Sequence, residues 1–320
     1  MTLTRRTVIA GAAGLALGAC TRPPAKWGPV TIARASSYSG ELYDLVRRIL
    51  IEHRVEAKGK RVVLKPNLVE FADNFAINTH PNLVQAAREA FLSLGAAEVR
   101  IAEGPGHRRI TLDLADAAGF FSAIPKFESV FTDLNLDDVS EVHLLHPQSK
   151  LNSLYLPHTV LGCDLLVSMP KTKTHHWAGA TLSMKNLFGL VPGGVYGWPK
   201  NVLHWAGIDE SIADLHKLFP RAFSIVDGIV GMEGNGPIQG TSKNFGVVVA
   251  GADPVAVDAT CCRLMRLDPL RIGYLRLAAG ENRLNESLIP QAGESIASLA
   301  MPFAVLPQLE SLRLRLRAGG

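Results

Sequence analysis

The chain has 320 residues, of which 47% are hydrophobic and 19% charged, with a formal net charge of +4. A chain of this length can bury one large core or two modest lobes. The positive charge is mild and spread thinly outside the C-terminus, which argues against a nucleic-acid-binding protein, so no nucleic acid is expected as a partner.

The N-terminus has the pattern of an export signal. Arg5 and Arg6 precede an apolar run, Val8–Ala19, that is too short and too rich in small residues for a stable membrane span. Paired arginines before such a run are typical of a twin-arginine (Tat) signal, although Val8 stands where phenylalanine is usual. The run ends in Leu-Gly-Ala-Cys, which resembles a bacterial lipobox with Cys20 as the acylated residue; the alternative is an uncleaved N-terminal anchor.

These features predict an exported protein of the periplasm or cell envelope, with the Tat translocase as a transient partner. They divide the chain into a signal peptide over residues 1–19, a tether over 20–27 and a folded domain over 28–300. Residues 301–320 form an Arg/Leu-rich tail, whose arginines at 313, 315 and 317 are expected on a solvated face.

The first half of the chain alternates strand and helix patterns. Apolar residues at Leu42, Leu45, Val46, Ile49 and Leu50 have the spacing of an amphipathic helix. Thr79 is a candidate N-cap for the next helix, with proline at the first helical position. We expect strands over 29–33, 61–64 and 98–102 and helices over 41–56, 80–94 and 111–118.

The middle and the second half are less regular. Short strands are expected over 130–134, 141–145 and 153–156, as a small antiparallel or irregular region, and a buried strand over 164–169. Residues 168–194 are predicted to form a polar loop rich in glycine and proline, with a helix over 180–187. Residues 196–204 are predicted to form a lid or substrate loop. Further helices are expected over 208–218, 253–265 and 271–279, with strands over 222–226 and 245–250.

Together these patterns predict an α/β fold, with a mainly parallel sheet flanked by helices and two lobes as an option. In such sheets ligands bind at the carboxyl ends of the strands. Polar residues cluster at those expected positions.

Seven short motifs in order resemble the domain-of-unknown-function 362 family. They are LKPNLV (64–69), THPNLV (79–84), EGPG (103–106), MPKTKTH (169–175), TLSMKNLFGLVPG (181–193), DGIVGMEGNGP (227–237) and ADPVAVDA (252–259). The resemblance covers about 28–280 and implies the family without a biochemical activity. Some members carry an appended ferredoxin segment, which this chain lacks.

The cysteines argue against an iron–sulfur cluster. Cys20 belongs to the signal, Cys163 stands alone, and Cys261 and Cys262 are neighbours in a helical context, with no C-x-x-C spacing anywhere. A site for a divalent metal made of His and carboxylate ligands stays possible, with His80, His107, His175 and His204 available.

The candidate site combines lysines that suit an anionic ligand with acids, histidines and glycines beside them. As catalytic residues we expect Lys171, Lys173, His175, Glu103 and Glu233. As ligand- or cofactor-binding residues we expect Lys65, Asn67, Lys185, Asn186, Gly104, Gly106, Gly234 and Gly236.

For three acids a structural role is an alternative to a functional role. Asp227-Gly228 can be a turn, Asp253 is expected to cap a helix, and Asp258 is expected to pair with one of the lysines. The leading hypothesis is an exported enzyme acting on a phosphate- or carboxylate-bearing small molecule. The alternative is a membrane-tethered protein that binds such a ligand without turnover.

Overall fold

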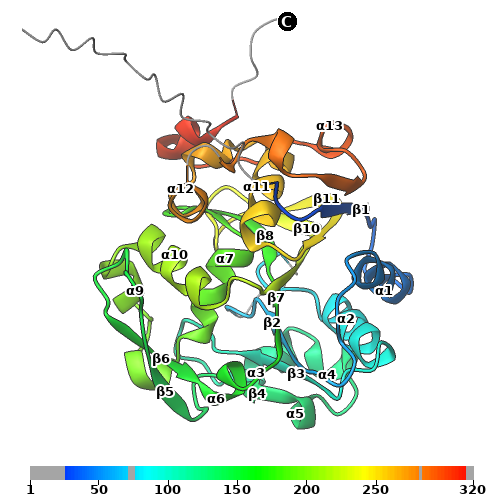
Figure 1. The fold of residues 1–320 in the computed structure, drawn as a ribbon, viewed down its shortest axis with the longest axis vertical. Helices are drawn as coiled ribbons and strands as arrows, with labels where there is room; N and C mark the ends of the chain where they lie inside the picture. The colour runs from blue at the N-terminus through cyan, green and yellow to red at the C-terminus, as the bar shows by residue number, and fades with distance from the viewer. Residues whose placement is uncertain (1–25, 71–75, 281–282, 315–320) are drawn as a thin grey trace, which may run out of the picture.

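The computed structural model describes residues 26–70, 76–280 and 283–314 (Figure 1). The export signal, Cys20 and most of the proposed tether lie outside the described residues, as do Arg315 and Arg317. No helix in these ranges is both long enough and apolar enough to cross a lipid bilayer.

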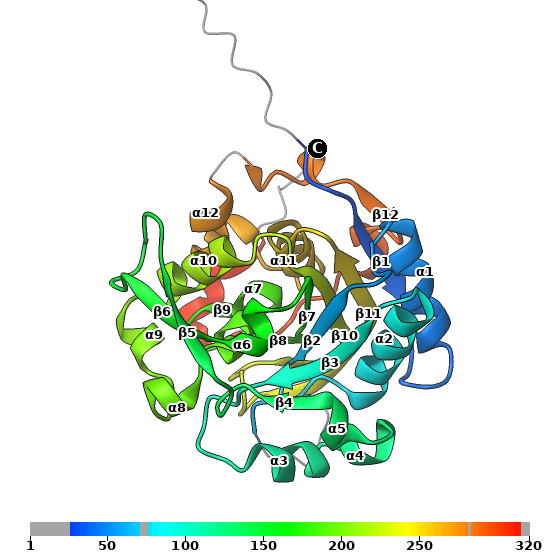
Figure 2. The same cartoon turned by 60° about the horizontal axis from the view of Figure 1, so that its bottom comes forward.

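A ten-stranded mixed sheet forms the centre of the molecule, as Figure 2 shows. The order along its main path is β12-β1-β11-β10-β7-β2-β3-β4, and β8 and β9 continue from β10. Pairing is parallel from β10 through β7, β2 and β3 to β4, whereas β11 is antiparallel to both β10 and β1. The strands are β1 (Val30–Arg34), β2 (Arg61–Pro66), β3 (Glu98–Glu103), β4 (Phe131–Asp133), β7 (Leu165–Met169), β8 (Lys171–His175), β9 (Gly179–Thr181), β10 (Phe223–Glu233), β11 (Thr241–Gly251) and β12 (Gln291–Gly293).

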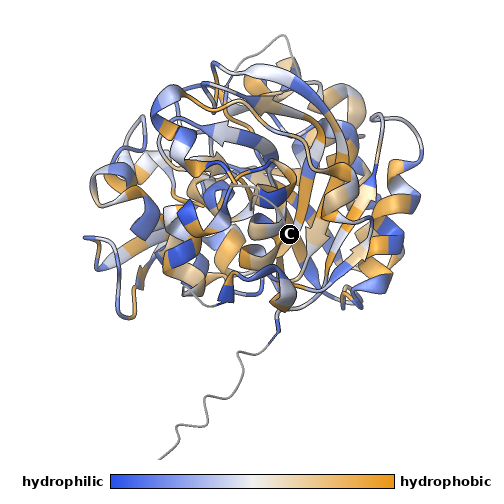
Figure 3. Ribbon diagram, turned by 90° about the horizontal axis from the view of Figure 1, so that it is seen from above, coloured by the Kyte–Doolittle hydropathy of each residue, from blue (hydrophilic) through white to orange (hydrophobic). Residues whose placement is uncertain are grey.

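Alternation of side chains along each strand gives the sheet a separate core on either face. In β2, Val62 and Leu64 contribute to one core and Val63 to the other. Figure 3 shows hydrophobic residues on the central strands and a mixture of hydrophobic and hydrophilic residues on the outer helices. One face is covered by α1 (Leu42–Glu52), α2 (Pro81–Ser93), α3 (Thr111–Ala117), α4 (Phe120–Ala123) and α5 (Phe127–Val130). The other face is covered by α6 (His158–Leu161), α7 (Ser183–Asn186), α8 (Gly193–Tyr196), α9 (Val202–Trp205), α10 (Ile208–Leu218), α11 (Pro254–Leu264), α12 (Gly273–Ala279) and α13 (Ile296–Leu299).

The predicted α/β class with a mainly parallel sheet is confirmed. The antiparallel middle region is a two-stranded sheet of β5 (Val139–His143) and β6 (Ser153–Pro157). Both halves of the described chain contribute strands to the ten-stranded sheet. A shared sheet therefore joins the regions that were considered as two lobes.

The largest local difference from prediction lies after β7. The stretch expected to be a polar loop begins instead with β8, which pairs in parallel with β10 at Lys171–Asp227 and Lys173–Met232. This pairing is possible because β10 does not end in a turn at Asp227-Gly228 but continues through an irregularity to Glu233. The turn interpretation is therefore wrong.

Two helix caps were predicted, and one is confirmed. Asp253 caps α11, accepting hydrogen bonds from the backbone N–H groups of Val255 and Ala256. At α2 the cap is His80 instead of Thr79. The Thr79 hydroxyl is used elsewhere, because it accepts from the Asn67 N–H and donates to the Met169 carbonyl, linking the ends of β2 and β7.

The described part of the 301–320 tail packs onto the domain. Phe303 is fully buried, and its ring lies 4.9 Å from the ring of Phe245 on β11. Residues Pro307–Leu312 form a 3-10 helix, and the Arg313 guanidinium donates to the Phe303 carbonyl. The packed domain therefore extends beyond residue 300.

Candidate functional site

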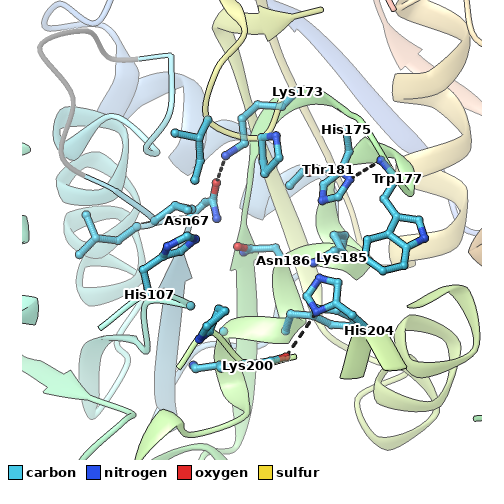
Figure 4. Close-up of a pocket in the computed structure, with 18 of the residues that line it drawn as sticks. Asn67, His107, Lys173, His175, Trp177, Thr181, Lys185, Asn186, Lys200 and His204 are labelled. Carbon is cyan, nitrogen blue, oxygen red and sulfur yellow. Dashed lines mark hydrogen bonds between the residues drawn. The ribbon is translucent and has the colours of Figure 1, made fainter. Parts of the chain in front are cut away.

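A cavity of about 580 Å³ lies beside the carboxyl ends of β2, β3 and β8 (Figure 4). Among the described residues that line it, the only carboxylate is Glu103. The lining lysines are Lys65, Lys173, Lys185 and Lys200, and the lining histidines are His107, His175, His176 and His204. The described lining therefore gathers four lysines around a single acid.

Glu103 forms an ion pair with Lys65. Both side chains are buried, with Lys65 Nζ 2.5 Å from Glu103 Oε2. Lys65 also donates to the Asn186 side chain and to the Pro66 carbonyl, so its three N–H groups are all used. Because the charge of Glu103 balances that of Lys65, the other three lysines have no compensating acid among the described lining residues.

Lys173 is fully buried and has neutral partners. Its ammonium donates to Asn67 Oδ1 at 2.7 Å and to the Ile77 carbonyl at 2.9 Å. Burial, reinforced by the neighbouring charge of Lys171, holds its pKa well below the usual lysine value. A bound anion would stabilise the charged form of this amine.

Lys185 and Lys200 have pKa values close to neutral pH. Burial is the main cause that lowers the pKa of each to about 7, and Lys65 adds repulsion in both cases. Lys200 Nζ donates to the Gly104 carbonyl at 2.6 Å. Lys185 Nζ lies 3.6 Å from the centre of the Phe188 ring.

His175 lines the cavity as a neutral imidazole. Its Nδ1 accepts the backbone N–H groups of Trp177 and Ala178, so the proton resides on Nε2. Burial, followed by the charge of Lys185, lowers its pKa to about 2. His175 therefore offers a hydrogen-bond donor, and its charged form is strongly disfavoured.

Two glycines allow close packing of the backbone beside the cavity. A Cβ at Gly189 would lie 2.0 Å from Glu103 Oε1 and 2.5 Å from Lys65 Nζ. A Cβ at Gly104 would lie 2.8 Å from Asn135 Oδ1 and 2.9 Å from the Gly189 carbonyl. A side chain at Gly189 would displace the ion pair, and one at Gly104 would clash with Asn135 and the Gly189 backbone, which explains glycine at both positions.

Most of the predicted site residues lie at the cavity. The structure places nine of the predicted residues in its lining, and leaves Lys171, Glu233, Gly234 and Gly236 outside it. The nine are Lys65, Asn67, Glu103, Gly104, Gly106, Lys173, His175, Lys185 and Asn186.

Glu233 and its glycine neighbours have structural contacts. Glu233 forms an ion pair with Lys243 at 2.7 Å and accepts the backbone N–H of Ala304. The Gly234 and Gly236 carbonyls accept hydrogen bonds from residues 174 and 176 at the end of β8. A Cβ at Gly236 would lie 2.0 Å from a backbone oxygen of β8, so close packing explains this glycine.

Lys171 is part of a separate buried network. Its ammonium lies 2.7 Å from Asp227 Oδ2, and both side chains are fully buried. Tyr38 Oη accepts from Lys171 and donates to Asp227 Oδ1, and the His80 N–H donates to Asp227 Oδ2. The network joins β8 to β10 and to the start of α2.

Asp258 does not pair with a lysine. Its two carboxylate oxygens accept the backbone N–H groups of Ser183 and Met184, at 2.8 and 3.0 Å. Burial raises its pKa to about 7. The carboxylate thereby fixes the first turn of α7, the element that carries Lys185 and Asn186.

Sequence reasoning missed Lys200 and gave His204 only a weak role as a metal ligand. Both lie in the 196–204 segment, which was singled out as a lid or substrate loop, and residues 199–201 and 204 line the cavity. The His204 ring lies 5.4 Å from Trp177 and 5.6 Å from Phe188. The sequence feature that pointed to this segment was its content of aromatic and polar residues. Tertiary packing determines which of these residues face the cavity.

Within the described ranges, neither potential metal ligands nor cysteines form a second functional site. There, no group of three or more His, Cys, Asp or Glu residues is close enough to hold a metal ion. Cys163, Cys261 and Cys262 are free thiols, and burial raises the pKa of each.

Comparisons with known proteins agree with the motif pattern. The model of the family described as domain of unknown function (DUF362) matches residues 62–263. A thylakoid-associated protein of Synechocystis sp. is 28% identical over 287 residues, which cover 85% of this chain and 84% of that protein.

Two solved structures are similar at a lower level. The apoprotein of lactate racemase from Thermoanaerobacterium thermosaccharolyticum has a TM-score of 0.47 and 15% identity, covering 75% of this chain and 57% of that one. A Thermotoga maritima protein has a TM-score of 0.41 and 15% identity, covering 62% and 52%. The chain thus matches between about half and three-fifths of the length of these structures.

Proposed function

Since the chain belongs to the DUF362 family, which is defined without an activity, we propose a function from its cavity: the protein binds an anionic small molecule there and acts on it as an enzyme. The single observation that carries the proposal is the charge balance of the cavity. In the part of the chain that the structure describes, four lysines and one carboxylate line it, and that carboxylate is paired with Lys65.

Burial of the lysines makes an anion in the cavity energetically favourable. Placing a positive charge away from water is unfavourable unless a counter-charge accompanies it. Lys173 and Lys200 are buried and form no ion pair among the described residues, and the pKa of each is lowered mainly by burial. An anion in the cavity would supply the missing counter-charge, and a volume of about 580 Å³ is suited to a small metabolite.

Catalysis is supported by the amines at the cavity. A group exchanges protons most effectively when its pKa is close to the working pH. Lys185 and Lys200, each with a pKa of about 7, meet this condition, whereas an ordinary lysine does not. A protein that only bound an anion would be served better by lysines that stay charged.

Titration calorimetry with sulfate tests whether the cavity binds an anion. The charge of sulfate is constant between pH 6 and pH 9, so a change in affinity with pH comes from the protein. We expect affinity to fall about tenfold or more from pH 6 to pH 9, since Lys185 and Lys200 lose their protons near pH 7. A neutral polyol of similar size serves as the control ligand. The absence of sulfate binding at pH 6, or an affinity that does not change with pH, would overturn the proposal.

We further propose that the protein is exported and held at a membrane surface through an acylated Cys20. The paired arginines and the lipobox-like sequence before Cys20 support this, as does the thylakoid association of the Synechocystis relative. Labelled palmitate should enter the wild-type protein in a bacterial host and be lost in Cys20→Ala. Equal labelling of both proteins would argue against acylation at this residue.

A further inference from the structure

We infer that Lys185 is the covalent nucleophile of the cavity and forms an imine with the carbonyl carbon of an anionic aldehyde, ketone or keto acid. This inference rests on the proposed function, because the anionic group of the substrate brings the carbonyl to Lys185. It adds the chemical class of the substrate and the type of reaction.

Bonding distinguishes Lys185 from the other lysines of the cavity. The amines of Lys65, Lys173 and Lys200 each donate to at least one oxygen atom. Within the described residues, Lys185 has no hydrogen-bond or ion-pair partner, and its Nζ lies against the face of the Phe188 ring. Its side chain is half-buried and lines the cavity. An amine held in this way is available to react with a ligand.

The surroundings of Lys185 favour the neutral amine, the form that attacks a carbonyl. Burial is the main cause, and the charges of Lys65 and Lys200 act in the same direction. The acid lining the cavity, Glu103, is paired with Lys65. The nearby imidazoles of His175 and His204 are neutral at pH 7, because their pKa values are lowered to about 2 and about 4.

The backbone that carries Lys185 is fixed from both ends of its helix. Asp258 accepts the N–H groups at the first turn of α7. At the other end, Asn186 is bound to Lys65 and Ser168 through its side-chain amide. Buried polar contacts of the neighbouring residues therefore fix the backbone of Lys185, while its amine contacts the Phe188 ring and has no hydrogen-bond partner among the described residues.

The reaction can be written with these groups alone. The Lys185 lone pair attacks the carbonyl carbon, a C–N bond forms, and a proton moves from nitrogen to oxygen to give a carbinolamine. The Lys200 ammonium, which lines the same cavity, donates a proton to that hydroxyl. The C–O bond breaks, water leaves, and the nitrogen lone pair forms the C=N bond of a protonated imine. The step needs no oxidant or reductant.

Borohydride trapping tests the inference directly. The wild-type protein is incubated at pH 7 with pyruvate, reduced with sodium borohydride, and analysed by mass spectrometry. We expect one addition, equal to the mass of the acid less one oxygen atom, on the peptide that contains Lys185. At pH 7 the fraction of free amine at Lys185 is on the order of 1,000-fold larger than at an ordinary lysine, so labelling should be selective.

Three controls make the outcome decisive. Lys185→Arg should lose the addition. Lys58→Arg, which alters an exposed lysine in the α1–β2 connection outside the cavity lining, should keep it, and excess sulfate should slow it. The same experiment is repeated with glyoxylate, an acid whose aldehyde carbonyl is more reactive than the ketone of pyruvate.

If neither acid labels Lys185 while sulfate still binds as expected, the imine inference is wrong and the proposed anion site stands. If sulfate does not bind, the proposed function itself fails. Labelling spread evenly over surface lysines would also contradict a selective nucleophile at Lys185.

Discussion

Replacing Asp227 with alanine is expected to lower the free energy of unfolding by about 3–5 kcal/mol. The substitution leaves the fully buried Lys171 ammonium with Tyr38 Oη as its hydrogen-bond partner, and it also removes the acceptor for the His80 N–H. A loss of this size is a large share of the stability of a typical domain. Urea denaturation, with an unchanged dependence on denaturant, measures it.

A second variant separates the charge effect from the loss of packing. Adding Lys171→Met to Asp227→Ala removes the uncompensated charge, so the double variant should be more stable than the single one. A double variant that is as unstable as Asp227→Ala, or less stable, would show that the ion pair is not the main source of the effect. The result bears on function, because this network positions β8 and therefore Lys173.

Replacing Lys185 and Lys200 together with methionine is expected to weaken sulfate binding at pH 6 by about 100-fold or more. Each charged hydrogen bond contributes about 1.5 kcal/mol or more, and two such contributions give this factor. The same variant should lose the fall in affinity between pH 6 and pH 9, because the two amines that titrate near pH 7 are gone.

The matched control is Lys58→Met, which removes one exposed charge and does not touch the cavity lining. Its sulfate affinity should stay within about twofold of the wild type, since surface charges contribute little. The account fails if the double variant binds as the wild type does, or if Lys58→Met weakens binding to a similar extent.

The sequence predicted the parts of the site that follow from regular structure. Lys65 and Glu103 end two strand patterns separated by a helix pattern, so their neighbourhood follows from the geometry of a parallel sheet. The helix predicted over 41–56, which the structure shows over Leu42–Glu52, and the short antiparallel region could likewise be recognised from periodicity and turn residues.

The parts that could not be predicted depend on contacts between distant segments. Strand β8 has the sequence KTKTH, which has no apolar face and therefore looks like a loop. Its lysines are buried because Asp227 and Asn67, from other strands and loops, supply the partners. Lys200 was missed for the same reason, since its contact is the Gly104 carbonyl nearly one hundred residues earlier.

The most direct measurement of the central claim is anomalous diffraction from a crystal grown with a low concentration of selenate. The charge balance of the cavity predicts a selenium peak within hydrogen-bond distance of Lys185 or Lys200, and that peak should disappear when sulfate or pyruvate is added in excess. Selenate found only at surface lysines, with none in the cavity, would contradict the claim that this site binds an anion.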